Sequence, residues 1–172
     1  MADGAVEVLL FPEPGADRAT WEALAGALDG GDVVASVDEG APGANPVAAI
    51  RGRVAAAASS AVVVAAGSSA LDALAAATGA EPPPSLVLLS PDAPAGEDYA
   101  AYRGEGASKL FLAGRGEVDV TEELARWSIG WTATVVFPSG QSRSALLAEW
   151  FDHIVDQVEG FVLQEAATRG GS

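Results

Sequence analysis

The chain alternates between short apolar runs and longer segments with helical spacing. Six runs have the length and composition of buried strands, and several of them are closed by glycine or proline. A strand buried on both faces is apolar without interruption, so this pattern is typical of a parallel sheet with helices on both sides. The predicted strands are Val6 to Phe11, Val33 to Val37, Ala61 to Ala66, Ser85 to Leu89, Lys109 to Ala113 and Ala133 to Phe137.

The segments between these strands carry helix signals. Asp17 and Asn45 stand where a capping side chain is expected, and Pro46 fits the first helical position. Gly79 is a suitable stop for the helix that follows the third strand. The predicted helices start after Asp17, run from Pro46 to about Ser59, from Ala70 to Ala77 and from Thr121 to Trp127, with a short one around Tyr99 to Arg103.

The last helix has the clearest pattern, an apolar stripe opposite an acidic face, and we expect it to fray beyond Thr168. The stripe consists of Leu147, Trp150, Phe151, Ile154, Val155, Val158, Phe161 and Val162.

Strands that alternate with helices predict one three-layer α/β/α domain over residues 1–172, with a disordered tail at 169–172. Right-handed crossovers make the six-stranded, mainly parallel sheet doubly wound. In such sheets the functional site lies beyond the carboxyl ends of the strands. The loops that matter are therefore 11–17, 38–44, 67–69, 90–98, 114–120 and 138–143.

Charge and composition narrow the function classes. The net charge is −15 and Lys109 is the single lysine, so we expect no binding to nucleic acid. A high-salt host and GC-rich coding both explain this composition. Without cysteines the chain has no thiol nucleophile or thiolate metal site. No apolar run is long enough for a membrane span and no secretory pattern begins the chain, so we expect a soluble, cytoplasmic protein.

No phosphate-binding signature is present. A P-loop is absent, and the pairs Gly104/Gly106 and Gly114/Gly116 lack the third glycine and the strand-to-helix context of a dinucleotide site. The lone histidine, His153, stands on the polar face of the last helix, where we expect it to be exposed and not to bind a metal. We therefore expect neither a cofactor nor a metal.

Two serines occupy the small-residue turn between the third strand and its helix, which has the order of a nucleophile elbow. In the frame Ala66 to Ala70 both flanks of Ser68 are small, as a tight turn requires. The frame Gly67 to Leu71 instead centres on Ser69. The alternative interpretation is that both serines only cap the helix.

In order along the chain, these segments resemble the α/β-hydrolase family, specifically a small member without a lid. The resemblance rests on VLLFPEPGADRATWEALAGAL, VVASVDEGAPGA, VVVAAGSSALDALAAA, SLVLLSP, KLFLAGRGEVD and TVVFPSGQS. It implies the strand order 2-1-3-4-5-6. A flavodoxin-like fold is the structural alternative. A sharp turn with positive φ at Ser68 would favour the hydrolase fold over it.

The resemblance assigns the remaining triad positions. It places the acid at Glu117, or at Asp119 nearby, unless these belong to a solvated acidic loop. It places Gln141 where the family has its histidine, and an amide cannot serve as a general base. Where the family commonly has His-Gly after the first strand, this chain has Phe11-Pro12-Glu13, and proline offers no N–H to an oxyanion.

Two functional hypotheses follow. The first is a catalytically degenerate hydrolase-fold protein that binds a small molecule or a protein partner, with Phe11, Pro12, Glu13 and Pro91 at the pocket. The second is a serine esterase or thioesterase that uses Ser68 or Ser69, or a non-hydrolytic enzyme in the same pocket. Aromatic side chains would line the pocket or an interface, and homo-oligomerisation through the last helix or an outer strand is a further hypothesis. These aromatics are Phe11, Tyr99, Tyr102, Trp127 and Trp131.

Overall fold

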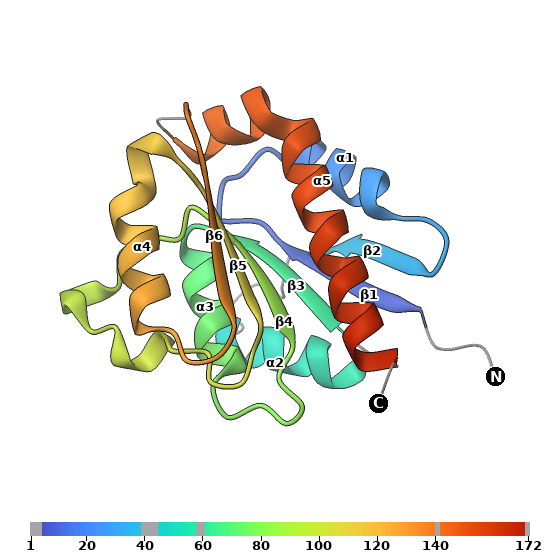
Figure 1. Ribbon diagram of the computed structural model, residues 1–172, viewed down its shortest axis with the longest axis horizontal. Helices are drawn as coiled ribbons and strands as arrows, with labels where there is room; N and C mark the ends of the chain where they lie inside the picture. Colours follow the sequence, from blue (N-terminus) through green and yellow to red (C-terminus); the bar gives the residue numbers. More distant parts are fainter. Residues whose placement is uncertain (1–4, 39–44, 58–60, 140–141, 171–172) are drawn as a thin grey trace.

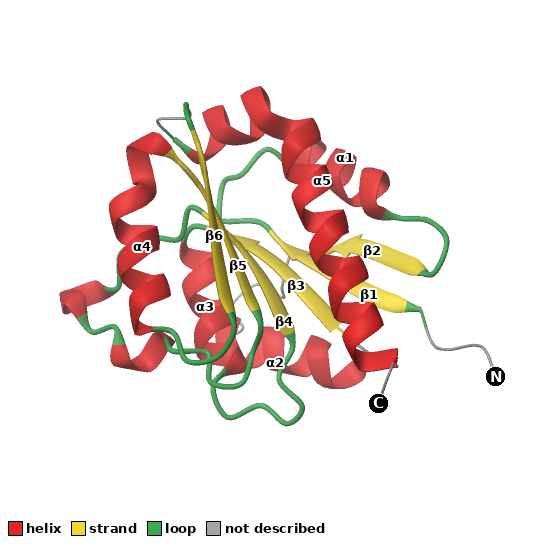
Figure 2. Ribbon diagram, in the orientation of Figure 1, coloured by secondary structure: helices red, strands yellow, loops and turns green. Residues whose placement is uncertain are grey.

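The structure, a computed structural model, describes residues 5–38, 45–57, 61–139 and 142–170. Six strands form one parallel sheet in the order β2-β1-β3-β4-β5-β6, which confirms the predicted topology (Figures 1 and 2). Their carboxyl ends meet along one edge, where Ala66 pairs with Leu89 and Gly114 with Phe137. The strands are β1 (Val6–Phe11), β2 (Val33–Val37), β3 (Ala61–Ala66), β4 (Ser85–Leu89), β5 (Lys109–Gly114) and β6 (Thr132–Phe137).

Helices cover both faces of the sheet, as the uninterrupted apolar strands predict. One apolar cluster joins the sheet to α1 (Arg18–Leu28) and α5 (Arg143–Gly170). A second cluster, on the opposite face, joins it to α2 (Pro46–Ala56), α3 (Ser68–Ala77) and α4 (Val118–Trp127) (Figure 1). The architecture is thus three-layer α/β/α. None of the helices within the described residues is long and apolar enough to cross a membrane.

The capping residues act as predicted, whereas some helix bounds differ. Asp17 accepts a hydrogen bond from the Ala19 N–H, and Asn45 accepts one from the Ala48 N–H. The second helix ends at Ala56 instead of about Ser59, and α5 continues through Gly170, past the point where we expected fraying. Short 3₁₀ turns occupy Ala95–Glu97, Ala100–Tyr102 and Arg115–Glu117.

Helix α5 packs through the predicted apolar stripe but is not regular throughout. Leu147, Ile154 and Val158 are buried, while Trp150 has non-helical angles (φ −119°, ψ 21°) that divide the helix. Its first residue is fixed by the preceding Ser142, whose hydroxyl accepts a hydrogen bond from the Ala145 N–H. Arg143 follows this cap directly, and its side chain lies at the carboxyl edge of the sheet.

The single lysine has a structural role at the opposite edge. Lys109 begins β5 and is completely buried, and its Nζ donates to the carbonyls of Gly104, Ala107 and Ile129 at 2.8, 2.7 and 2.9 Å. All three ammonium protons therefore have acceptors, and the side chain ties together the loops that precede β5 and β6. Burial lowers the pKa of Lys109 to about 8.

Replacing this side chain should destabilise the fold. Lys109→Met leaves three carbonyls without their donor, and we expect a loss of about 3 kcal/mol in the free energy of unfolding at pH 7. Exposed Arg126→Met serves as the control.

The pH dependence of stability is a second readout. Between the native pKa of about 8 and the unfolded value of 10.5, the unfolded wild type binds more protons than the native state, so its stability rises with pH. Urea unfolding should therefore show a larger wild-type advantage at high pH. A small effect at pH 7, or an advantage that shrinks at high pH, would contradict this role.

Candidate functional site

The turn between β3 and α3 is sharp, and glycine makes it. Gly67 has φ 60° and ψ −125°, the mirror image of an ordinary type II turn residue and a conformation that other residues adopt only under strain. Its N–H donates to the Leu89 carbonyl at 3.2 Å, and its own carbonyl accepts from the Asp92 N–H at 3.1 Å. The turn thus has the shape of an elbow, but the residue with positive φ is Gly67 and not the expected Ser68.

Both serines lie in the first turn of α3 instead of at the apex. The Ser69 hydroxyl donates to the Pro12 carbonyl at 2.9 Å, which ties the helix to the loop after β1. The N-cap is Gly67, and no side chain caps this helix end. The interpretation of the serines as helix caps is therefore wrong.

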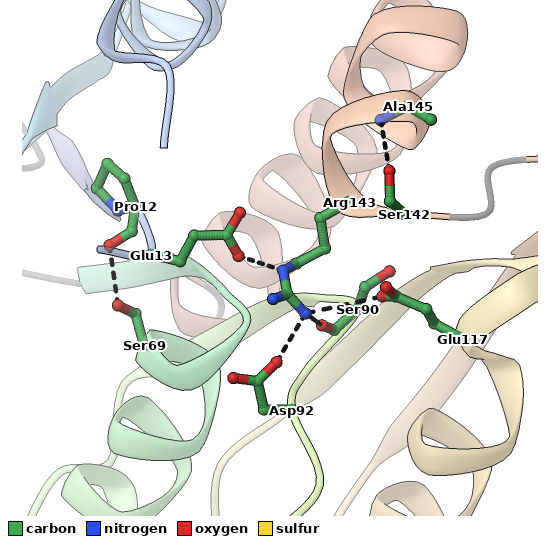
Figure 3. A network of polar contacts seen from close by, with 9 residues as sticks. All are labelled: Pro12, Glu13, Ser69, Ser90, Asp92, Glu117, Ser142, Arg143 and Ala145. Carbon is green, nitrogen blue, oxygen red and sulfur yellow. Dashed lines mark hydrogen bonds and ion pairs between the residues drawn. The ribbon is translucent and has the colours of Figure 1, made fainter. Parts of the chain in front are cut away.

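Arg143 lies at the centre of the site, surrounded by three carboxylates from three different loops (Figure 3). Its Nε forms a close ion pair with Glu13 from the loop after β1. Its Nη1 donates to Asp92 at 2.7 Å and lies 3.8 Å from Glu117. Because Asp92 follows β4 and Glu117 follows β5, one guanidinium links the ends of three strands to the start of α5.

The backbone after β4 contributes a further contact. The carbonyl of Ser90 accepts a hydrogen bond from Arg143 Nη1 at 3.0 Å. Ser90 is buried and has φ 38°, an unusual value for a residue other than glycine. Its own N–H donates to the Leu112 carbonyl at 2.8 Å, which continues the pairing of β4 with β5. The carbonyl that Arg143 needs is therefore positioned by the sheet itself.

The ion pair of Glu13 and Arg143 fills the space in front of Gly67. A Cβ atom on Gly67 would overlap Glu13 Oε2, and it would lie 2.9 Å from Arg143 Cζ and 3.0 Å from Arg143 Nε. These distances are shorter than normal contacts, so a side chain at this position would require Glu13 and Arg143 to leave their observed positions. In an elbow this is the position from which the nucleophile projects.

Burial and charge act together on these groups. Burial raises the pKa of the Glu13 carboxyl, against the opposing effect of Arg143 and with a smaller contribution from Asp92 and Glu117. Burial also opposes the charge of Arg143, but the three carboxylates outweigh it and raise the pKa of the guanidinium. Arg143 stays protonated, so it stabilises negative charge and cannot accept a proton.

A cavity of about 370 Å³ opens beside this network, between the loop after β1 and helices α2 and α3. Phe11, Pro12 and Glu13 line it, and so do both serines. The lining does not include Pro91. Apolar residues from β1, β2 and α2 form much of the wall. Asp72 of α3 also lines the cavity, and burial raises its pKa.

Of the remaining candidate residues from the sequence that the structure describes, one joins the Arg143 network and the others do not. Glu117 is half-buried and joins the network, whereas Asp119 is exposed on α4. His153 is exposed as predicted, with its ring against Trp150. Gln141 lies outside the described residues. The part of the chain that the structure describes contains no cluster of His, Cys, Asp or Glu suited to a metal.

Arg143 and Asp92 are not among the site residues predicted from the sequence. The available signal was an arginine in the loop 138–143, in a chain with only nine lysines and arginines, together with carboxylates in three other site-forming loops.

Comparisons with known proteins support the fold. No protein-family model and no curated protein matches the chain. Among solved structures, the chain is similar to a protein from Pectobacterium atrosepticum assigned as a YdeN-like hydrolase, with a TM-score of 0.66 and 14% identity over 92% of this chain and 91% of that one. This likeness shows an α/β-hydrolase-like core.

A side chain at Gly67 should conflict with the ion pair. Gly67→Ala brings backbone strain of about 1–3 kcal/mol and must also displace Glu13 or Arg143. Gly31→Ala controls for a positive φ, because Gly31 has a φ of 58° and no atom within 4 Å of the added Cβ. We expect chemical denaturation to show that Gly67→Ala costs at least about 1 kcal/mol more than the control.

The double variant Glu13→Ala/Gly67→Ala tests whether the ion pair causes the extra loss of stability. Removing the Glu13 carboxylate by Glu13→Ala frees the space, so Gly67→Ala should cost less in that background than in the wild type. Equal costs in both backgrounds would mean that the ion pair does not occupy the position in front of Gly67.

Proposed function

We propose that this protein is a catalytically degenerate member of the α/β-hydrolase fold, which binds a small molecule without hydrolysing it. A single observation carries the proposal. The elbow position belongs to Gly67, and the space in front of it is filled by the ion pair of Glu13 and Arg143. Glycine supplies no nucleophile, so the turn retains the shape of a hydrolase elbow without its reacting atom.

The groups around Gly67 support the same proposal. Hydrolysis through a serine needs a general base that takes the hydroxyl proton and returns it to the leaving group. The side chain that enters from the start of α5 is a guanidinium, which has donors only and remains charged. Its three carboxylate partners hold it in place, while the adjoining cavity is large enough for a small organic molecule.

A serine hydrolase is the competing function, and one observation favours it. Ser68 lines the cavity at the N-terminus of α3, next to backbone N–H groups of the kind that stabilise an oxyanion. Ser69 is less suited, because its hydroxyl already donates to the Pro12 carbonyl. Under this alternative Ser68 would be the nucleophile and Glu117 or Asp119 the displaced acid or base.

Labelling with a fluorophosphonate distinguishes the two functions. We expect no covalent adduct on Ser68 or Ser69 by peptide mass spectrometry, and no turnover of p-nitrophenyl acetate above that of the Ser68→Ala/Ser69→Ala variant. The variant is the matched control for background hydrolysis by the protein surface. Stoichiometric labelling at either serine, together with ester turnover that the variant loses, would establish the hydrolase and overturn the proposal.

A further inference from the structure

The cavity contains a carboxylate that no cation in the described residues neutralises. Asp72 lies one helical turn after Ser68 on α3, is partly buried and lines the cavity together with residues of β1, β2 and α2. Within the described residues it takes part in no hydrogen bond or ion pair. The network around Arg143 is separate, since its carboxylates are Glu13, Asp92 and Glu117.

The arginines on the surrounding elements all have other partners. Arg18 from the start of α1, which also lines the cavity, pairs with Glu22 at 2.6 Å, and Arg53 of α2 pairs with Asp38 at 2.7 Å. Arg51 of α2 donates to three carbonyls at the end of α3. The other carboxylates that line the cavity are paired, Glu13 with Arg143 and Asp38 with Arg53.

An unpaired, partly buried carboxylate is a cost to the folded state. Burial raises the pKa of Asp72, and no neighbouring charge acts in the other direction. Asp72 lies in the middle of α3, away from the positive N-terminal end that would favour an anion. A partly buried carboxylate without a partner in a cleft is a candidate site for a cation.

The rest of the wall suits an apolar body. Side chains of Phe11, Val37, Ala49 and Ile50 line the cavity, whose volume of about 370 Å³ fits a small organic molecule. A cation with an apolar substituent would neutralise Asp72 and bury its substituent against these side chains.

We propose that the cavity binds an organic ammonium ion, with Asp72 as the anchoring carboxylate and the apolar wall around its substituent. This inference rests on the proposed binding function and names the chemical class of its ligand. It also gives α3 a role that does not involve either serine, because the anchor lies one turn further along the helix.

The 2-phenylethylammonium ion and its neutral analogue 2-phenylethanol test the proposal by NMR titration of the labelled full chain. For the wild type we expect saturable shifts of amides lining the cavity with the ammonium ion. We expect at least about tenfold weaker binding of the alcohol, and of the ammonium ion to Asp72→Asn. Asp152→Asn, a change at an exposed aspartate on α5, should bind as the wild type does. Equal affinity of the wild type and Asp72→Asn, or no saturable shift at the cavity, would overturn the inference.

Stability gives a second readout that needs no ligand. Because the native pKa of Asp72 is raised, the native state binds more protons than the unfolded state between its ordinary value of 3.8 and that raised pKa. Ionised Asp72 thus destabilises the fold above this window, and the effect disappears as the pH falls through it. Asp72→Asn should unfold at a higher temperature than the wild type at pH 7, with the gain lost in acid and absent in Asp152→Asn.

A lower unfolding temperature for Asp72→Asn at pH 7 would assign Asp72 a structural role and overturn the inference. The two proposals fail separately. Labelling of a serine would contradict the proposal that the protein has lost hydrolysis, but it would not change the result of the ammonium titration. A failed titration would contradict the ammonium site, but it would not supply the elbow with a nucleophile.

Discussion

One guanidinium among three carboxylates determines how the loops at the carboxyl edge of the sheet can be arranged. Arg143 contacts Glu13, Asp92 and Glu117, which come from three loops that are far apart in sequence. Without it, three partly buried negative charges would face one another in a protein whose net charge is already −15. The cation therefore does more than form a surface ion pair, because it makes the convergence of these loops compatible with folding.

This arrangement has a consequence for chemistry. The volume next to Gly67 is available either to a side chain on the elbow or to the ion pair, and in this chain the ion pair occupies it. The cavity between α2, α3 and the loop after β1 remains beside the network. Under the proposed function, a scaffold that positions a nucleophile in a hydrolase is retained for binding, since the cavity depends on the helices and not on the reacting atom.

The sequence predicted the fold well and the site only in part, for physical reasons. Strands and caps are local signals, so the strand positions and the roles of Asp17 and Asn45 followed from spacing. The sheet order followed from the resemblance to the α/β-hydrolase family. The elbow was placed one residue late, because a glycine followed by two serines fits more than one frame and only the backbone angles select Gly67. The Arg143 network joins four distant segments, and no local pattern indicates which loops meet. Within the described part of the chain, Asp72 is likewise unpaired because each neighbouring arginine side chain binds another partner, which the sequence does not show.

The most direct test of the account is the NMR signal of the Arg143 Nε–H group. If the guanidinium is held between Glu13, Asp92 and Glu117, this signal should be resolved and exchange slowly with water, in contrast to that of Arg126 in an exposed pair on α4. Glu13→Gln should shift and broaden the Arg143 signal and leave that of Arg126 unchanged. An Arg143 signal that exchanges as fast as that of Arg126, and that does not respond to Glu13→Gln, would show that the space in front of Gly67 is open and would contradict the account.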